Sequence, residues 1–167
     1  MNHPFERSKC DCDQCKAACR HMPGTLAPGD FEQIAAHLGE EPNAEFAAKY
    51  FQASDGPLVA QHGKQFRIPT VVPALTPTGC VFLDAEGHCR IHAVAPFGCA
   101  VYRMCVNEPH DNDKSHFVLT EIIRQLQSSG PYRQTMESLL NADKIAPPLT
   151  DRRSALGLAL YSLKDNL

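Results

Sequence analysis

The chain has 167 residues, of which 43% are hydrophobic, a length that supports one compact domain and leaves little room for two. Its 16 Lys and Arg residues and 19 Asp and Glu residues give a net charge of -3, which argues against a nucleic-acid-binding surface. The N-terminal segment has no apolar stretch typical of a signal peptide, and no apolar run approaches the roughly 18 residues of a membrane span. We therefore expect a cytoplasmic protein with neither nucleic acid nor a membrane among its partners.

The N-terminal part of the chain is dense in cysteine, with thiols at Cys10, Cys12, Cys15 and Cys19. The Cys12-x-x-Cys15 spacing lets one turn direct two sulfurs at the same ion, and Cys19 follows about one helical turn later on the same side. Because an unexported protein keeps its cysteines reduced, this pattern predicts metal ligands and not structural disulfides.

A helical pattern follows, from about residue 28 to residue 53. A first helix is predicted from Pro28, and its apolar stripe, which ends before Gly39, consists of Phe31, Ile34, Ala35 and Leu38. A second helix is predicted from Asn43 to Ala53, with a buried side formed by Phe46, Tyr50 and Phe51.

Short strands are predicted in the proline-rich stretch after the helices, at Phe66–Ile68 and Val71–Val72. The sequence then predicts a β-hairpin that pairs residues 81–84 with residues 89–92, around a tight turn at Gly87. Such a hairpin would bring Cys80 and Cys89 together. The two remaining cysteines of the chain, Cys99 and Cys105, would have to join them by folding.

In the C-terminal third, the sequence predicts helices only. Ser115 is a candidate cap for a helix that ends before Gly130, Pro131 opens another that ends before Pro147, and Thr150 is a candidate cap for a last one. The overall expectation is an α+β fold, mostly helical: a small single domain with a short β-hairpin and a cysteine-ligated metal centre. Residues 1–110 would form the cysteine-cluster metal-binding region, and residues 111–167 a helical C-terminal extension packing on the same domain.

Other interpretations of the eight cysteines are weaker. Disulfides fit the even number, one or two thiols could be ordinary core residues, and Cys12-x-x-Cys15 could be a redox motif, although no strand of a thioredoxin-like unit precedes it. Eight buried thiols without metal would be reactive and would stabilise little, whereas a bound cation offsets the charge of several thiolates at once. We therefore predict that all eight cysteines are metal ligands.

Several segments resemble the YkgJ-like cysteine-cluster (CxxCxxCC) family of zinc- or iron-chelating proteins, over roughly residues 12–105. The resemblance is carried by Cys12-Asp-Gln-Cys15-Lys-Ala-Ala-Cys19, by Leu26 to Ile34, by Gly79-Cys80-Val-Phe-Leu-Asp84 with Gly87-His-Cys89-Arg-Ile-His92, and by Pro96-Phe-Gly-Cys99-Ala-Val-Tyr102. It implies that six cysteines are ligands, namely Cys12, Cys15, Cys19, Cys80, Cys89 and Cys99, with Cys10 and Cys105 as additional local thiols. The chain departs from the family pattern at Ala18, His92, Ala95 and Ala100, where relatives have cysteine, tyrosine and two arginines.

Two metal types suit this pattern. Eight cysteines could form two closed four-ligand zinc sites, but three closely spaced sulfurs with remote partners favour an iron-sulfur cluster such as 4Fe-4S. The three histidines beside cysteines, at positions 21, 88 and 92, are expected to be solvated or packed and not ligands.

We expect a metal-binding protein that acts as a carrier, sensor or electron-transfer partner, with a protein partner left open. The alternative is a metalloenzyme, redox or methylation-related, with an open coordination position. The sequence contains none of the common nucleotide-binding or hydrolase motifs.

Overall fold

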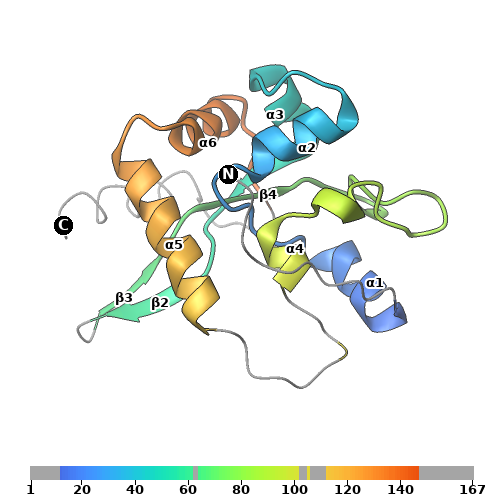
Figure 1. Ribbon diagram of the computed structural model, residues 1–167, viewed down its shortest axis with the longest axis horizontal. Helices are drawn as coiled ribbons and strands as arrows, with labels where there is room; N and C mark the ends of the chain where they lie inside the picture. The colour runs from blue at the N-terminus through green and yellow to red at the C-terminus, as the bar shows by residue number, and fades with distance from the viewer. Residues whose placement is uncertain (1–11, 62–63, 102–104, 106–111, 147–167) are drawn as a thin grey trace.

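The structure, a computed structural model, describes residues 12–61, 64–101, 105 and 112–146 (Figure 1). Cys10 and the helix predicted from Thr150 lie outside these residues. Within them the elements in chain order are α1 (Asp13–His21), α2 (Asp30–Leu38), α3 (Ala44–Tyr50), β1 (Phe51–Ser54), β2 (Leu58–Gln61), β3 (Lys64–Arg67), β4 (Thr70–Pro73), β5 (Leu75–Thr76), β6 (Gly79–Cys80), the 3-10 helix η1 (His92–Val94), α4 (Phe97–Val101), α5 (Asn112–Gln127) and α6 (Pro131–Asn141). None of the helices in the described part is both long and apolar enough to cross a membrane. The fold is therefore α+β, with helices as its main component, as the sequence predicts.

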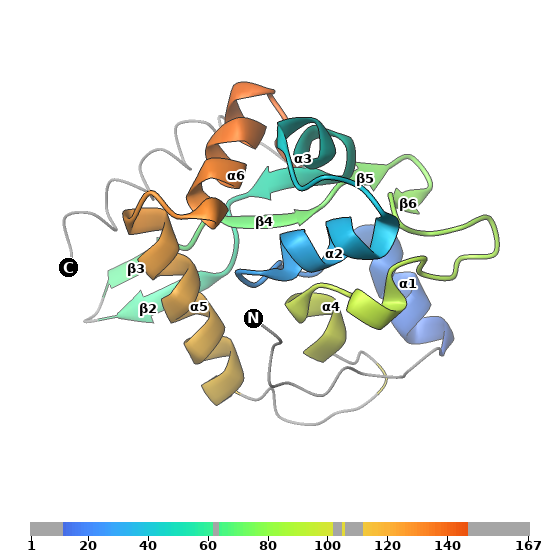
Figure 2. The same cartoon turned by 45° about the horizontal axis from the view of Figure 1, so that its top comes forward.

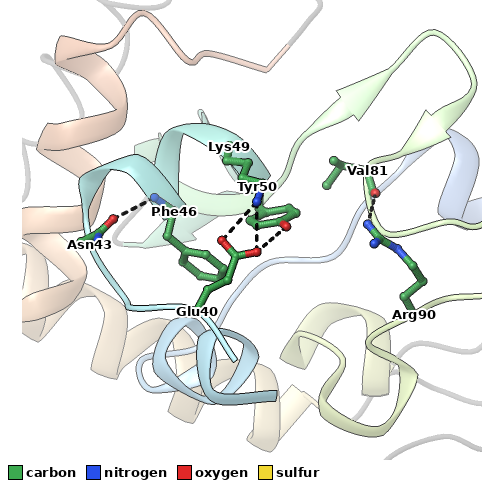
Figure 3. Close-up of polar contacts among 7 residues, drawn as sticks. All are labelled: Glu40, Asn43, Phe46, Lys49, Tyr50, Val81 and Arg90. Atoms are coloured by element: carbon green, nitrogen blue, oxygen red, sulfur yellow. Dashed lines mark hydrogen bonds and ion pairs between the residues drawn. The ribbon is translucent and has the colours of Figure 1, made fainter. Parts of the chain in front are cut away.

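Helix α2 confirms the predicted stripe and end, because it buries Phe31, Ile34 and Ala35 and ends just before Gly39, but it begins at Asp30 and not at the predicted Pro28. Helix α3 is shorter than predicted. It begins after Asn43, whose side chain accepts a hydrogen bond of 3.0 Å from the backbone N–H of Phe46 (Figure 3), and it ends at Tyr50. The predicted continuation to Ala53 is wrong, because residues 51–54 pair as strand β1 with β4, a long-range partner that local helix patterning does not reveal.

The strands form three separate antiparallel pairs: β1 with β4, β2 with β3, and β5 with β6. The predicted segments 66–68 and 71–72 fall largely on β3 and β4. The predicted hairpin at residues 81–92 is wrong as a pair of strands. Cys80 instead pairs with Leu75, and the two predicted strands are joined by a single bridge, between Leu83 and Cys89.

The turn inside that predicted hairpin is present. Gly87 has φ 83°, and the carboxylate of Asp84 accepts hydrogen bonds from the backbone N–H groups of Glu86 (3.0 Å) and His88 (2.8 Å). Backbone hydrogen bonds from Asp84 to His88 and from Arg90 to Phe82, both 2.9 Å, close the loop together with these side-chain bonds. This still returns the chain so that Cys89 lies near Cys80.

Helix α5 begins at Asn112, so Ser115 is not its cap, because the residues just before Ser115 are already helical. Helix α6 opens at Pro131 as predicted and packs against α3 and β1, while α5 packs against α6 (Figure 2). The buried hydroxyl of Tyr132 accepts a hydrogen bond from the N–H of Val71 (2.9 Å) and donates one to the carbonyl of Leu26 (3.1 Å). Helix α6 therefore fixes β4 and the segment after α1 to each other.

The core centres on an aromatic group from α2, α3, β1 and the turn after β6. Ring centroids of neighbouring pairs are 5.1 to 5.7 Å apart, and the group consists of Phe31, Phe46, Tyr50, Phe51 and Phe82. Phe82 and Ile91 are fully buried, each two residues from a cysteine. This packing holds Cys80 and Cys89 at the edge of the core.

Candidate metal centre

Four cysteines from separate segments converge beside the core. Cys19 lies on α1, Cys80 on β6, Cys89 after the Gly87 turn and Cys99 on α4; we call these the inner thiols. All four are partly buried, and none of the cysteines in the described residues forms a disulfide. The inner thiols are close enough to act on one another electrostatically. Burial is the main cause that raises the pKa of Cys99, and the hydrogen bond from Gly24 lowers it. Negative charge on the other three inner thiols raises it further.

Backbone groups lie beside three of these sulfurs. The N–H of Gly24 donates a hydrogen bond of 3.1 Å to the Cys99 sulfur, and the backbone at Phe82 and at Ile91 lowers the pKa of Cys80 and of Cys89, against the larger effect of burial. An N–H donor stabilises a thiolate more than a thiol, because the charged acceptor makes the stronger hydrogen bond. The backbone is therefore arranged for sulfur atoms that carry negative charge.

Burial opposes that charge. Desolvation is the main reason that the pKa of Cys19, Cys89 and Cys99 lies above its usual range, and it raises the pKa of Cys80 to about 12. At neutral pH these groups would be protonated in the absence of a cation. A bound metal ion offsets the desolvation cost and displaces the thiol protons, so the donor set fits a metal and is poorly suited to solvent-exposed thiolate chemistry.

The position of Cys99 depends on a close backbone crossing. A Cβ atom on Gly24 would lie 2.2 Å from the backbone nitrogen of Cys99, and one on Gly98 would lie 2.4 Å from the nitrogen of Thr25. The N–H of Gly98 also donates to the carbonyl of Thr25 at 2.8 Å. Only glycine fits at both positions, because the two backbones are in direct contact.

A second set of cysteines lies at the other end of α1. The sulfurs of Cys12, Cys15 and Cys105, which we call the outer thiols, all lie within 4.8 Å of one another. Cys12 immediately precedes α1, Cys15 is in its first turn, and Cys105, an exposed residue, comes from the chain beyond α4. The distance between the Cys15 and Cys105 sulfurs is 3.8 Å.

The two sets differ in spacing. A tetrahedral ion with Zn–S bonds of about 2.3 Å holds its sulfurs about 3.8 Å apart, which matches the outer thiols. In the described part of the chain only the outer thiols satisfy the 4.8 Å limit, so no three inner sulfurs do. The inner thiols surround a wider space than one such ion requires.

That space opens into a cavity of about 530 Å³. All four inner thiols and Cys15 line it, together with Thr70 and Val72 of β4, Phe97 of α4 and Val118 of α5. The hydroxyl of Thr70 is fully buried and has no hydrogen-bond partner among the described residues. The inner thiols thus adjoin a chamber whose wall is mainly apolar.

Sequence reasoning missed a positive charge beside the inner thiols. The guanidinium of Arg90 lowers the pKa of Cys80 and Cys89, against the larger effect of burial, and it is held by a hydrogen bond of 3.1 Å to the carbonyl of Val81 (Figure 3). The sequence signal was its place directly after Cys89. Arg90 thus places a positive charge beside Cys80 and Cys89.

The structure groups seven of the eight predicted ligands, four inner and three outer. The grouping differs from the order of the cysteines along the chain, because Cys19 joins the distant Cys80, Cys89 and Cys99, and Cys105 joins the N-terminal pair. No histidine or carboxylate of the described residues belongs to the compact outer set.

These features define a cysteine-rich metal-binding protein. Residues 11–121 match the CxxCxxCC family, described as "Putative zinc- or iron-chelating domain", and the chain belongs to this family because the match covers more than half of it. This confirms the resemblance seen in the sequence. A search of curated proteins and a search of solved structures gave no significant match.

Proposed function

We propose that the inner thiols hold an iron-sulfur cluster, and that the protein acts in the cytoplasm as a carrier, sensor or electron-transfer partner of another protein. The observation that carries the proposal is the convergence of four partly buried thiols, from four separate segments, at a spacing wider than one tetrahedral ion needs. Zinc at the same four thiols is the competing assignment.

The hydrogen bonds at these sulfurs support the cluster. Hydrogen bonds to cluster sulfurs and the degree of solvent exposure set reduction potentials, and here the Cys99 sulfur accepts the N–H of Gly24, while backbone groups lower the pKa of Cys80 and Cys89. When bound, a cluster supplies one-electron chemistry. The residues of this chain hold it, shield it from water and offset its thiolate charge through Arg90.

A metalloenzyme is the second candidate, and the cavity is the observation that favours it. A space of about 530 Å³ beside the inner thiols is in the size range of small-molecule sites. Its apolar wall and the buried hydroxyl of Thr70 suit an organic substrate with a polar group. An enzyme of this kind would keep one coordination position open to that substrate.

Metal and acid-labile sulfide analysis of anaerobically purified protein tests the proposal. Iron and sulfide in equal amounts, with broad visible absorbance that bleaches on reduction, are expected for a cluster. If the protein is colourless and contains zinc but no sulfide, the inner thiols hold zinc and the cluster assignment is wrong. Cys89→Ser should remove most of the iron, and Ser138→Ala, a change on α6 that touches none of the seven cysteines, should leave it unchanged.

A further inference from the structure

The cavity beside the inner thiols extends beyond the segments that carry them. Its lining includes residues of α1, α4 and α5, and both ribbon views show α4 between the other two helices (Figure 1, Figure 2). Strand β4 and helix α5, which carry no cysteine, contribute Val72, Val118 and Leu119 to the wall. Hydrocarbon side chains do not bind metal ions, so the metal centre does not explain this part of the cavity.

One face of the β1–β4 pair forms part of that wall. Thr70 and Val72 alternate with Val71 along β4, and Ser54 of β1 lies opposite Thr70, so the side chains of Ser54, Thr70 and Val72 share a face. All three residues line the cavity. The hydroxyl of Ser54 already accepts a hydrogen bond of 3.2 Å from the N–H of Gly56.

The hydroxyl of Thr70 differs from that of Ser54. Thr70 is fully buried, and its hydroxyl has no hydrogen-bond partner in the part of the chain that the structure describes. A buried hydroxyl without a partner destabilises a fold, whereas valine would fill nearly the same space without that cost. Packing alone therefore does not explain threonine at this position, and a polar atom bound in the cavity would.

The charges around the cavity indicate which ligands suit it. No Asp or Glu is among its described lining residues, and its basic residues, Lys16 and His92, each lie three residues from an inner thiol in the sequence. The region between β4 and α5 thus offers hydroxyl groups and apolar side chains. A charged group buried there would lose its hydration without gaining a countercharge, and a neutral group avoids this cost.

We propose that this cavity binds an uncharged, mainly apolar organic molecule whose single hydrogen-bonding group pairs with the hydroxyl of Thr70. The apolar part of the ligand packs between β4 and α5, against Val72, Val118 and Leu119. An alcohol or a carbonyl compound suits the site, because a threonine hydroxyl both donates and accepts. The volume of about 530 Å³ is in the range of small-molecule sites. The proposal requires neither catalysis nor a particular metal at the inner thiols.

Two matched pairs of probes test the proposal on anaerobically purified, metal-loaded protein: para-cresol with para-xylene, and cyclohexanol with methylcyclohexane. In each pair a hydroxyl is exchanged for a methyl group of similar size, and NMR titration measures the dissociation constants. We expect both alcohols to bind the wild type. Thr70→Val should weaken the binding of the alcohols about 3- to 10-fold relative to the matched hydrocarbons, because one hydrogen bond is lost.

Thr120→Val is the matched control for Thr70→Val. It makes the same chemical change at an exposed position of α5, where the hydroxyl donates to the carbonyl of His116 at 2.8 Å. The affinity for the alcohols relative to the hydrocarbons should not change in this variant.

Leu119→Trp tests the position of the ligand, because the larger side chain extends from the α5 wall. It should weaken the binding of all four probes about tenfold or more, with unchanged metal content. Thr70→Val keeps the test decisive if Leu119→Trp does not fold. The proposal is overturned if the wild type binds neither alcohol, if Thr70→Val leaves the relative affinities unchanged, or if folded Leu119→Trp binds the probes like the wild type.

Failure of the proposed cluster would give a different result. The wild type would then contain no iron or sulfide, while alcohol binding that depends on Thr70 would remain. Iron and sulfide in a protein that binds neither alcohol would leave the cluster in place and remove the ligand site.

Discussion

The carboxylate of Asp30 accepts a hydrogen bond of 2.7 Å from the backbone N–H of Phe97, and both residues are buried. The same carboxylate oxygen accepts the N–H of Ala27 at 2.8 Å. Asp30 is the first residue of α2, and Phe97 is the first residue of α4, which carries Cys99. One side chain thus joins the segment before α2 to the helix that presents a predicted metal ligand.

Asp30→Ala is expected to destabilise the protein by about 2 to 4 kcal/mol, because two buried N–H groups lose their acceptor. Asp30→Asn retains one acceptor oxygen and should cost less. Urea unfolding monitored by circular dichroism measures both. Glu137→Ala, which removes only an exposed ion pair with Arg133, should change stability by about 0 to 1 kcal/mol. If Asp30→Ala lowers the free energy of unfolding no more than Glu137→Ala does, the hydrogen bonds of Asp30 are not important for stability.

Gly98→Ala should lower both stability and metal content. The new Cβ would lie 2.4 Å from the backbone nitrogen of Thr25, and neither backbone can move aside cheaply. Overpacking of this kind typically costs about 1 to 3 kcal/mol, and here it would also displace Cys99. Metal analysis and thermal unfolding provide the two measurements.

Gly39→Ala is the matched control for Gly98→Ala. Gly39 also has a backbone unfavourable to alanine, with φ 70°, but a Cβ there would meet nothing within 4 Å. It should therefore cost some stability without loss of metal. Equal metal loss in the two variants would mean that the effect comes from general destabilisation and not from the position of Cys99.

Removal of the metal should lower the unfolding temperature, because inner thiols from α1, β6, the turn and α4 lose their common partner. Cys89→Ser should cost several kcal/mol, and chelation should then have little further effect. Cys15→Ser, which removes an outer thiol, should cost less. Scanning calorimetry before and after anaerobic chelation measures these differences. Identical unfolding temperatures of the wild type and Cys89→Ser would show that the inner thiols do not stabilise the fold.

Acid should weaken a polar contact that contains none of the cysteines. Glu40 accepts a hydrogen bond of 2.6 Å from the Tyr50 hydroxyl and contacts the Lys49 ammonium at 3.1 Å (Figure 3), and these two hydrogen bonds, that of Tyr50 first, hold the pKa of Glu40 below its usual range. A carboxyl group with a lowered folded-state pKa stabilises the protein above its unfolded pKa, near 4.3. This stabilisation is lost as pH falls through the lower folded-state value.

Glu40→Gln should therefore show a smaller fall in unfolding temperature between about pH 5 and pH 3 than the wild type. Tyr50→Phe, which retains the ring stacked on Phe82, should show part of the same change because the main hydrogen bond is lost. The effect should be small, since Glu40 is a surface group. Parallel pH profiles for all three proteins would contradict the role of this contact.

Local sequence determined several elements correctly. The apolar stripe of α2 and its end before Gly39, the start of α6 at Pro131 and the turn at Gly87 depend on side chains within a few residues of one another. The cysteine spacing in the same way indicated metal binding, and the family match supports it. Local patterning failed at residues 51–54, where the aromatic periodicity of a helix continues into a strand that pairs with β4.

The sequence by itself determined that this chain carries a cysteine-based metal centre, because thiol type and short-range spacing are properties of the chain. Only the tertiary structure decided which sulfurs meet. Cys19 lies with Cys80, Cys89 and Cys99 and not with the cysteines next to it in sequence. Cys105 lies beside Cys15, which is 90 residues earlier in the chain. The grouping follows from long-range contacts, the glycine crossing at Gly24 and Gly98 and the Asp30 carboxylate, which no local pattern encodes.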